Sequence, residues 1–285
     1  MFTGDSTNLL ELSATTEETN ASPSNSQFRE QKLVEKYCRE TQLLKLIEGS
    51  AGKFVENYRT HRRPEDLLAP VQVRLDFVYR DLLRLSAKLL ELVVEEPLQF
   101  AEAVKYTVYG LVRDQLKTAG LKPIDISQLH AHWRLVGLPY TPGLQFEPRD
   151  NCLRLGLTQV QGILSAYTPP ENLVLQTIWY CGSGCMRNAI QTSSTDAPLC
   201  SGCSRPMSEY QKLRVTEQYH LLAILPGSAI QTPRTTGCLH RAKLVRLRAH
   251  THDCDLKLGG SYLITGYFAG GASTYQIEAC HLRSN

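Results

Sequence analysis

The sequence lacks any run of 18 or more apolar residues, so a membrane-spanning helix is not expected. Residues 1–6 show neither a basic stretch nor an apolar one, which predicts no secretion signal. Nine cysteines, an odd number without such a signal, argue against a disulfide framework and favour metal binding for any closely spaced subset. What is present, 285 residues of which 42% are hydrophobic and 21% charged, suffices for two domains, or for one domain with subdomains, with a packed core.

Motifs of the common catalytic classes are also missing. Gly49–Lys53 resembles a phosphate-binding loop but has the wrong glycine spacing and no Ser or Thr after the lysine. The chain contains no G-x-S-x-G elbow and no H-E-x-x-H helix, and no histidine, serine and carboxylate are spaced as a triad. We therefore expect a protein that is not an enzyme, with no catalytic residues and no small-molecule substrate.

Charge is distributed unevenly along the chain. The net charge is 31 minus 28, or +3, but residues 1–27 hold four acidic residues and no Lys or Arg, which predicts a disordered acidic leader. The stretch 231–252 has five basic residues and no acidic one, and such a stretch attracts phosphate. Without interleaved aromatic residues it is not expected to read a base sequence, and the solvated face of a strand explains it nearly as well. The nucleic-acid-binding residues predicted here are Arg241, Lys243, Arg246 and Arg248.

The periodicity of apolar residues divides the chain into two parts. Residues 28–122 read as a helical bundle, in which Pro97 is the first residue of a helix and residues 71–77 form one short strand. Residues 123–150, rich in Pro and Gly, read as a connector. From 151 to 280 short strands dominate, which favours a small barrel over a βαβ sheet, and 281–285 is a tail. The strands are expected around 160–164, 173–180, 242–249 and 261–268. The fold class is therefore α+β.

Four cysteines carry the strongest signal in the sequence. Two close pairs, Cys181-x3-Cys185 and Cys200-x2-Cys203, are separated by fourteen residues and have glycines in their turns. Two such turns can direct four sulfurs to one tetrahedral ion, and a closed shell of four thiolates fits one structural zinc ion (Zn2+) with no open position for a catalytic water. We expect Cys181, Cys185, Cys200 and Cys203 to be the metal ligands. The other cysteines are expected to be packed thiols.

A second metal site is conceivable at His250-x-His252-x-Cys254, where three ligand side chains would share one strand face. A loop suits this stretch equally well because Thr251 and Asp253 flank the ligands. Three aromatic residues could stack bases in a barrel groove, although core packing explains them better: Tyr167, Trp179 and Tyr262.

The order of these parts resembles the N-terminal region of the minichromosome maintenance (MCM) proteins. Residues 89–100 are similar to the family's leucine-rich run into an acidic-Pro turn, and Val160–Ser165 to its first barrel strand, with Gly162 at the characteristic glycine. The four cysteines match its zinc-ribbon ligands, and Leu263–Phe268 its Thr-Gly strand. The resemblance implies a helical A subdomain followed by an OB-fold barrel, with a zinc ribbon inserted at about 178–208.

The departures from the family refine what the resemblance implies. Residues 269–278, where the family presents basic residues to DNA, contain no Lys or Arg, so strong DNA binding there is not expected. The chain stops at Asn285, where an MCM helicase continues into its AAA+ ATPase. This resembles the diverged meiotic MCM-like proteins of insects, in which the two halves are separate chains that assemble to promote crossovers.

The resemblance thus implies a nuclear, non-catalytic subunit that acts in meiotic recombination. Its partners would be other MCM-like subunits, one of them carrying an ATPase-like half, with weak DNA contact and no membrane contact. Two alternatives remain open at this point: the N-terminal fragment of a replicative MCM helicase, and a stand-alone OB protein that binds single-stranded DNA.

Overall fold

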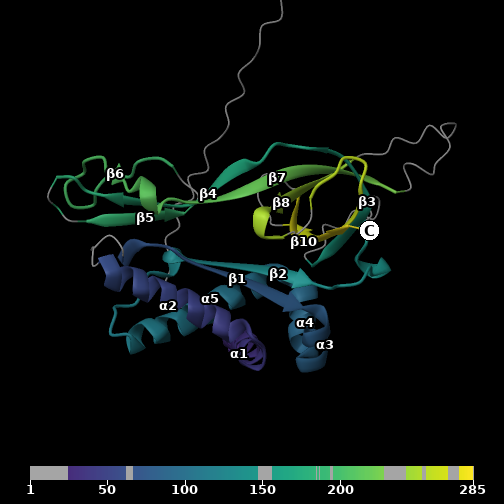
Figure 1. Ribbon diagram of the computed structural model, residues 1–285, viewed down its shortest axis with the longest axis horizontal. Helices are drawn as coiled ribbons and strands as arrows, with labels where there is room; N and C mark the ends of the chain where they lie inside the picture. The colour runs from purple at the N-terminus through teal and green to yellow at the C-terminus, as the bar shows by residue number, and fades with distance from the viewer. Residues whose placement is uncertain are drawn as a thin grey trace, which may run out of the picture.

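The computed structural model describes residues 25–61, 67–146, 156–183, 185, 187–192, 195–227, 242–251, 255–268 and 276–284. These residues form a mixed α+β fold, with the helices on one side and a β-barrel on the other (Figure 1). The acidic leader predicted for 1–27 lies almost wholly outside the described residues and stays a prediction.

The N-terminal part is a mixed α+β unit in which helices pack on a small sheet. In chain order, its described elements are α1 (Asn25–Glu40), α2 (Leu43–His61), β1 (Val71–Val78), α3 (Tyr79–Leu85), α4 (Ala87–Glu95), α5 (Pro97–Thr118), η2 (Ile126–Gln128) and β2 (Leu129–Val136). Pro97 begins α5, as predicted, because it has no N–H to lose in the first turn. Apolar residues recur along α5 at three- and four-residue spacing from Phe100 to Val112, and the side of the helix that they form is buried.

Strand β2 lies inside the segment 123–150, which the sequence analysis interpreted as a connector. It pairs with β1 in parallel over eight residue pairs, from Val71 opposite Leu129 to Val78 opposite Val136. One face of β2 is apolar and joins the helical core, whereas His130 and His132 occupy the other face and point toward the barrel. Apolar and polar residues alternate along 129–135, which is the pattern of a strand with one buried face, but the flanking Pro and Gly residues favoured the connector interpretation.

Aromatic rings connect the helical part to the barrel in an unbroken series. Tyr37 of α1 stacks on Phe77 of β1 at 5.3 Å between ring centroids, and Phe77 meets the edge of Phe100 at 4.9 Å. Phe100 packs edge-on against Trp133 of β2 at 5.0 Å, and Trp133 stacks on Tyr267 of the barrel at 5.9 Å. Because Tyr267 belongs to the barrel, the two parts share an apolar contact.

The C-terminal part contains a closed five-stranded barrel. Its strands are β3 (Thr158–Tyr167), β7 (Val215–Pro226), β8 (Lys243–Arg248), β9 (Ser261–Phe268) and β10 (Gln276–Ser284), and the short helices η3 (Pro142–Leu144) and η7 (Ala249–Thr251) lie beside it. The ring runs β3-β7-β8-β10-β9 and returns to β3. The β8–β10 pair is parallel and the other neighbours are antiparallel, which gives an OB-like barrel. The predicted barrel is therefore confirmed.

Two glycines allow the strands of this barrel to approach closely. A Cβ atom on Gly162 would lie 2.1 Å from the carbonyl oxygen of Leu225 on β7, and one on Gly266 would lie 2.4 Å from that of Glu278 on β10. Gly162 pairs with both β7 and β9, so it occupies the place where β3 passes from one neighbour to the other. Any side chain at either position would push two backbones apart.

A long hairpin projects from the barrel between its first and second strands. It contains β4 (Glu171–Tyr180), β5 (Asn188–Thr192), β6 (Ser208–Glu209) and η5 (Gln211–Leu213). The near half of β4 pairs with β7, and its far half pairs with β5 and β6 (Figure 1). The far end of the hairpin carries Cys181, Cys185, Cys200 and Cys203, which are free thiols.

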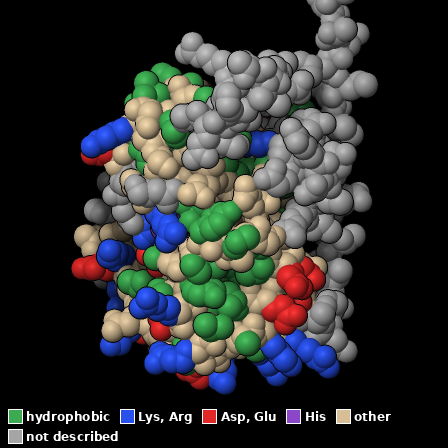
Figure 2. All heavy atoms as spheres, turned by 90° about the vertical axis from the view of Figure 1, so that its right-hand side faces the viewer, with side chains coloured by type: hydrophobic (Ala, Val, Ile, Leu, Met, Phe, Trp, Pro, Cys, Tyr) green, Lys and Arg blue, Asp and Glu red, His purple; other side chains and the backbone are tan. Residues whose placement is uncertain are grey.

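Large apolar side chains remain at the surface of the described residues. The most exposed are Leu199 at 65%, Leu258 at 64%, Leu83 at 56% and Leu244 at 52%. On the face shown in Figure 2, hydrophobic side chains gather between basic side chains. Among the described helices, none combines the length and the apolar character needed to cross a membrane.

Candidate metal centre and basic strand

The four cysteines lie in two facing turns at the far end of the hairpin. Cys181 directly follows β4, and its N–H donates to the carbonyl of Arg187, which closes the first turn. In the second turn Cys200 donates to the carbonyl of Arg205 and accepts at its own carbonyl from Ser204. Ser204 has a left-handed φ of 55°, a value that tight turns require. The two turns therefore bring residues 15 to 22 positions apart into one cluster.

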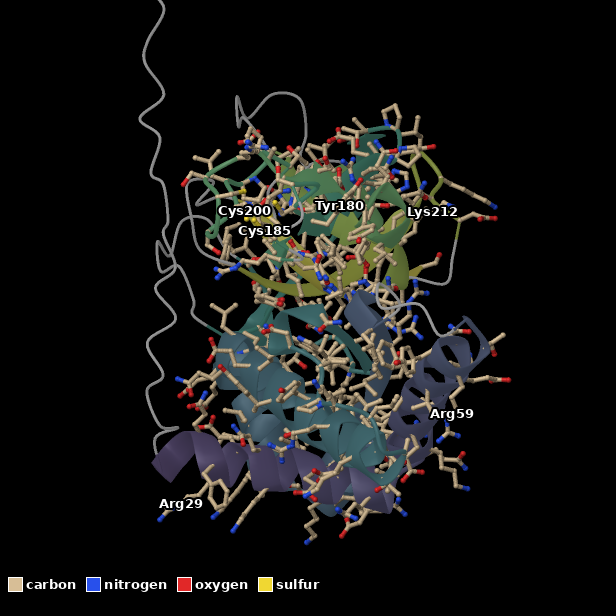
Figure 3. The ribbon with its side chains drawn as sticks, turned by 90° about the vertical axis from the view of Figure 1, so that its left-hand side faces the viewer. Arg29, Arg59, Tyr180, Cys185, Cys200 and Lys212 are labelled. Atoms are coloured by element: carbon tan, nitrogen blue, oxygen red, sulfur yellow. The ribbon has the colours of Figure 1, made fainter. Side chains whose placement is uncertain are left out.

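The cysteine sulfurs are arranged as ligands of one ion. All four lie within 4.8 Å of one another, and the Sγ atoms of Cys181 and Cys203 are 3.6 Å apart (Figure 3). Four sulfurs around a tetrahedral metal at 2.3 Å would be separated by about 3.8 Å, so the set fits a metal ion. The Gly202 N–H donates to Cys200 Sγ at 3.4 Å, an interaction that orients this sulfur. The predicted ligands are thus brought together in a cluster that can bind a metal ion.

The surroundings of the sulfurs shift the pKa values of Cys181 and Cys185 in opposite directions. A hydrogen bond from the Ser183 N–H, together with contacts to the other thiols, lowers the pKa of Cys181 to about 6. The hydrogen bonds that Cys185 shares with Cys203 and Cys181 raise the pKa of the Cys185 thiol to about 12. Closely spaced thiols of this kind release their protons when a metal cation binds to the sulfurs.

Two arginines link the turns across the cysteine cluster. Arg187 follows the first turn and donates to the Ser201 hydroxyl of the second at 2.9 Å, whereas Arg205 follows the second and donates to Ser183 of the first at 3.4 Å. A divalent ion with four thiolates carries a net charge of −2, which the two guanidinium groups offset. Trp179 and Met207 pack against the sulfurs and form a small apolar core.

Two of the basic residues predicted to contact nucleic acid, Arg246 and Arg248, form ion pairs with carboxylates of neighbouring strands. Arg246 and Arg248 share one face of β8, as predicted, but the carboxylate of Glu278 on β10 lies 3.6 Å from Arg246 and bonds Arg248 directly. Glu217 on β7 lies 3.4 Å from Arg248. Burial opposes the charge of Arg248, yet Glu278 and Glu217 together raise its pKa above the ordinary value.

The other predicted nucleic-acid contacts are placed as follows. Lys243 lies over the ring of Phe146 at 4.5 Å, and Arg241 is outside the described residues. Most of the stretch 269–278 also lies outside them. Of the aromatic residues considered for stacking, Trp179 and Tyr262 are buried and Tyr167 is 41% exposed. The arrangement offers little uncompensated positive charge among the described residues of β8.

The remaining predicted residues fall into two groups. Cys38 and Cys280 are buried thiols, and burial raises the pKa of each to about 12, which suits packed rather than reactive cysteines. The other three scattered cysteines lie outside the described residues: Cys152, Cys238 and Cys254. His252 of the conceivable second site also lies outside them.

His250 instead joins two residues that the sequence analysis did not single out. Its Nδ1–H donates to Glu217, and His132 of β2 lies with its Nδ1 4.0 Å from the other oxygen of that carboxylate. Burial lowers the pKa of His132 to about 4, although the charge of Glu217 opposes this. Burial would raise the pKa of Glu217, but the hydrogen bond from His250 and the surrounding charges hold it below its ordinary value. We call His132, Glu217 and His250 the seam cluster.

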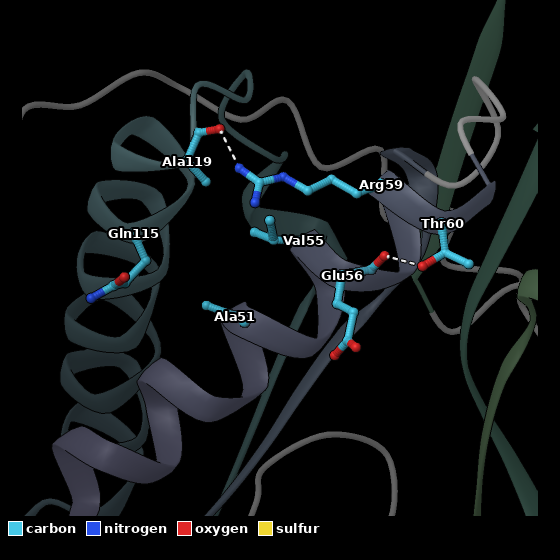
Figure 4. Close-up of a pocket in the computed structure, with 8 residues that line it drawn as sticks. Ala51, Val55, Glu56, Arg59, Thr60, Gln115 and Ala119 are labelled. Atoms are coloured by element: carbon cyan, nitrogen blue, oxygen red, sulfur yellow. Dashed lines mark hydrogen bonds between the residues drawn. The ribbon is translucent and has the colours of Figure 1, made fainter.

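A groove lies between α2 and α5 in the helical part. Its volume is about 460 Å³, and its described lining includes one carboxylate, Glu56, with no histidine or cysteine (Figure 4). Two of its polar side chains bond backbone carbonyls: Arg59 donates to that of Ala119 at 3.2 Å, and Thr60 to that of Glu56 at 2.9 Å. The lining supplies no nucleophile paired with a base.

Comparison of the chain with models of known families and with curated proteins finds no match.

Proposed function

We propose that this chain is a non-catalytic subunit of a nuclear MCM-like complex that acts in meiotic recombination and promotes crossovers. The observation that carries the proposal is the order of parts: a helical part, then an OB-like barrel, with a four-cysteine hairpin inserted between the barrel's first and second strands. This is the order that the resemblance to the MCM N-terminal region implies.

The quoted motifs lie at positions with a physical role, which supports the proposal further. Gly162 and Gly266, the glycines of the two barrel motifs, are the positions where a Cβ would collide with a neighbouring strand. A sequence that keeps glycine at both places keeps the geometry of a tightly closed barrel. The resemblance therefore rests on residues that the barrel needs and not on composition alone.

The bound metal is proposed to be one structural zinc ion. Four thiolates form a closed shell that suits zinc, and they leave no position for a catalytic water. In this role the ion would hold the end of the hairpin rigid. The exposed leucines, such as Leu199 beside the cysteines, would then contact other subunits, because exposed apolar side chains commonly mark interfaces.

The proposal also assigns little DNA affinity to the isolated chain. Glu217 and Glu278 offset the two arginines of β8, which leaves that strand with little charge for phosphate. This observation counts against the alternative of a stand-alone single-stranded DNA-binding protein.

Native isolation of the tagged chain from meiotic cells, after mild cross-linking, tests the proposal. We expect mass spectrometry to find MCM-like subunits, one of them with an ATPase-like half. A control with Cys203→Ser should lose those partners if the hairpin is the contact. The proposal is wrong if the folded, zinc-loaded chain is recovered without any MCM-like subunit. Recovery as the leading part of a longer polypeptide with an ATPase would instead favour the helicase alternative.

A further inference from the structure

The seam cluster lies where the helical part meets the barrel. His132 comes from β2, Glu217 from β7 and His250 from η7. The helical part and the barrel part of the fold therefore both supply side chains to the cluster. One ligand atom from each residue lies within 4.8 Å of the other two, and the two imidazole rings are 4.6 Å apart between centroids. Three donors from distant segments thus converge on one point.

The cluster is shielded from solvent and holds the donor types that transition metals prefer. The side chains of His132, Glu217 and His250 are 11%, 8% and 9% exposed. Two imidazole nitrogens and one carboxylate oxygen form a set typical of zinc and cobalt sites, whereas calcium and magnesium favour oxygen alone. A metal ion would bind the two imidazoles in their neutral form.

The groups around the cluster are compatible with this chemistry. Arg248 donates to one oxygen of Glu217 at 3.4 Å and also bonds Glu278 directly. His250 bonds the other oxygen of Glu217, and His132 lies 4.0 Å from the oxygen that Arg248 contacts, so the carboxylate faces both histidines. His130, two residues before His132 on the same face of β2, is bound at its Nε2 by Gln176 at 2.5 Å. It therefore lies beside the cluster without belonging to it.

We propose that His132, Glu217 and His250 form a second metal site, which binds a divalent transition-metal ion of the zinc or cobalt class. The ion would join β2 to the barrel and so fasten the helical part to it. This site is separate from the four cysteines and does not depend on the proposed function.

Titration of Co2+ into the full chain tests this site. The chain is first washed with a weak chelator that leaves the cysteine-bound ion in place. We expect about one further equivalent of Co2+ to bind, with weak d–d absorption and without the thiolate-to-cobalt charge-transfer band that cysteine ligation produces. We also expect the melting temperature to rise with Co2+, because an ion that binds only the folded chain stabilises it.

Variants separate ligation from a merely structural effect. His132→Asn and Glu217→Gln should each weaken Co2+ binding by more than about tenfold, since even loss of an outer-shell partner costs that much. His130→Asn, a matched change on the same face of β2, should bind Co2+ as the wild type does. The proposal fails if the wild-type chain takes up no Co2+ beyond the cysteines, or if the His132 and Glu217 variants bind it unchanged. Should His132→Asn not fold by circular dichroism, the wild-type titration and Glu217→Gln decide.

Discussion

The indole ring of Trp133 and the phenol ring of Tyr267 lie nearly parallel, with 10° between their planes and 5.9 Å between their centroids. Trp133 belongs to β2 beside the helices and Tyr267 to β9 of the barrel. This stacked pair joins the two halves of the fold.

We expect the Trp133–Tyr267 pair to couple the stabilities of the two halves. In a double-mutant cycle with Trp133→Leu and Tyr267→Leu, the coupling free energy should be about 0.5–1.5 kcal/mol, because stacked rings contribute this much beyond the area they bury. Urea denaturation of the four proteins measures it. Phe268→Leu, next to Tyr267 on the strand, is the control partner and should show a coupling with Trp133→Leu below about 0.5 kcal/mol. Equal coupling in both cycles would contradict a direct contact.

Loss of one cysteine ligand should release the ion from the hairpin. Cys203→Ser is expected to reduce bound zinc by about one ion per chain relative to the wild type, as measured by elemental analysis. The fluorescence of Trp179 should change at the same time, because this side chain packs against the sulfurs and the ion's binding is coupled to local folding.

Cys38→Ala is the matched control for this ligand, since Cys38 is a buried thiol in the helical part. It should leave the zinc content and the Trp179 fluorescence unchanged. Full zinc content in Cys203→Ser would overturn the assignment of the four cysteines.

The barrel glycines should not tolerate alanine. Gly162→Ala places a methyl group 2.1 Å from a backbone oxygen of β7, so the strands must separate. We expect the free energy of unfolding to fall by at least about 2 kcal/mol, in the range of overpacked cores. Gly110 in α5 has no atom within 4 Å of an added Cβ, and Gly110→Ala should stabilise the chain by about 0.5–1 kcal/mol. Thermal and urea unfolding give both values, and a neutral Gly162→Ala would contradict the close approach.

Removing an acidic partner of β8 should increase affinity for DNA. Glu278→Gln releases the charges of Arg246 and Arg248, so single-stranded DNA should bind more tightly and with a steeper dependence on salt. Fluorescence anisotropy at two salt concentrations measures both. Glu209→Gln, which breaks an ion pair with Arg214 in the hairpin, serves as the control and should have a smaller effect. If wild type and Glu278→Gln bind DNA equally, the acidic residues do not mask this strand.

Some parts of this molecule could be predicted from sequence because their signal is local. The cysteine spacing alone indicated a four-sulfur cluster, and the predicted strand 261–268 is β9 residue for residue. The strand expected at 242–249 is β8 at Lys243–Arg248, with Arg246 and Arg248 on one face as the alternation required. In each case neighbouring residues along the chain carry the pattern.

Other features depended on which segments meet in space. Strands β7 and β10 were not predicted, because Glu217 and Glu278 occupy inward positions and interrupt the apolar alternation that marks a strand. Strand β2 has that alternation, with histidines at its polar positions, but it lies among the Pro and Gly residues of the predicted connector. Those same polar residues face one another across the fold: Glu217 and Glu278 offset the arginines of β8, and Glu217 meets the two histidines of the seam cluster.

The sequence by itself determined the α+β class, the barrel and the four-cysteine cluster, because periodicity and short spacing are local properties. Only the tertiary structure decided that the basic strand is internally paired and that His132, Glu217 and His250 converge. Those contacts join residues 30 to 118 positions apart, and the free energy of a pair so distant depends on strand pairing that no local pattern records.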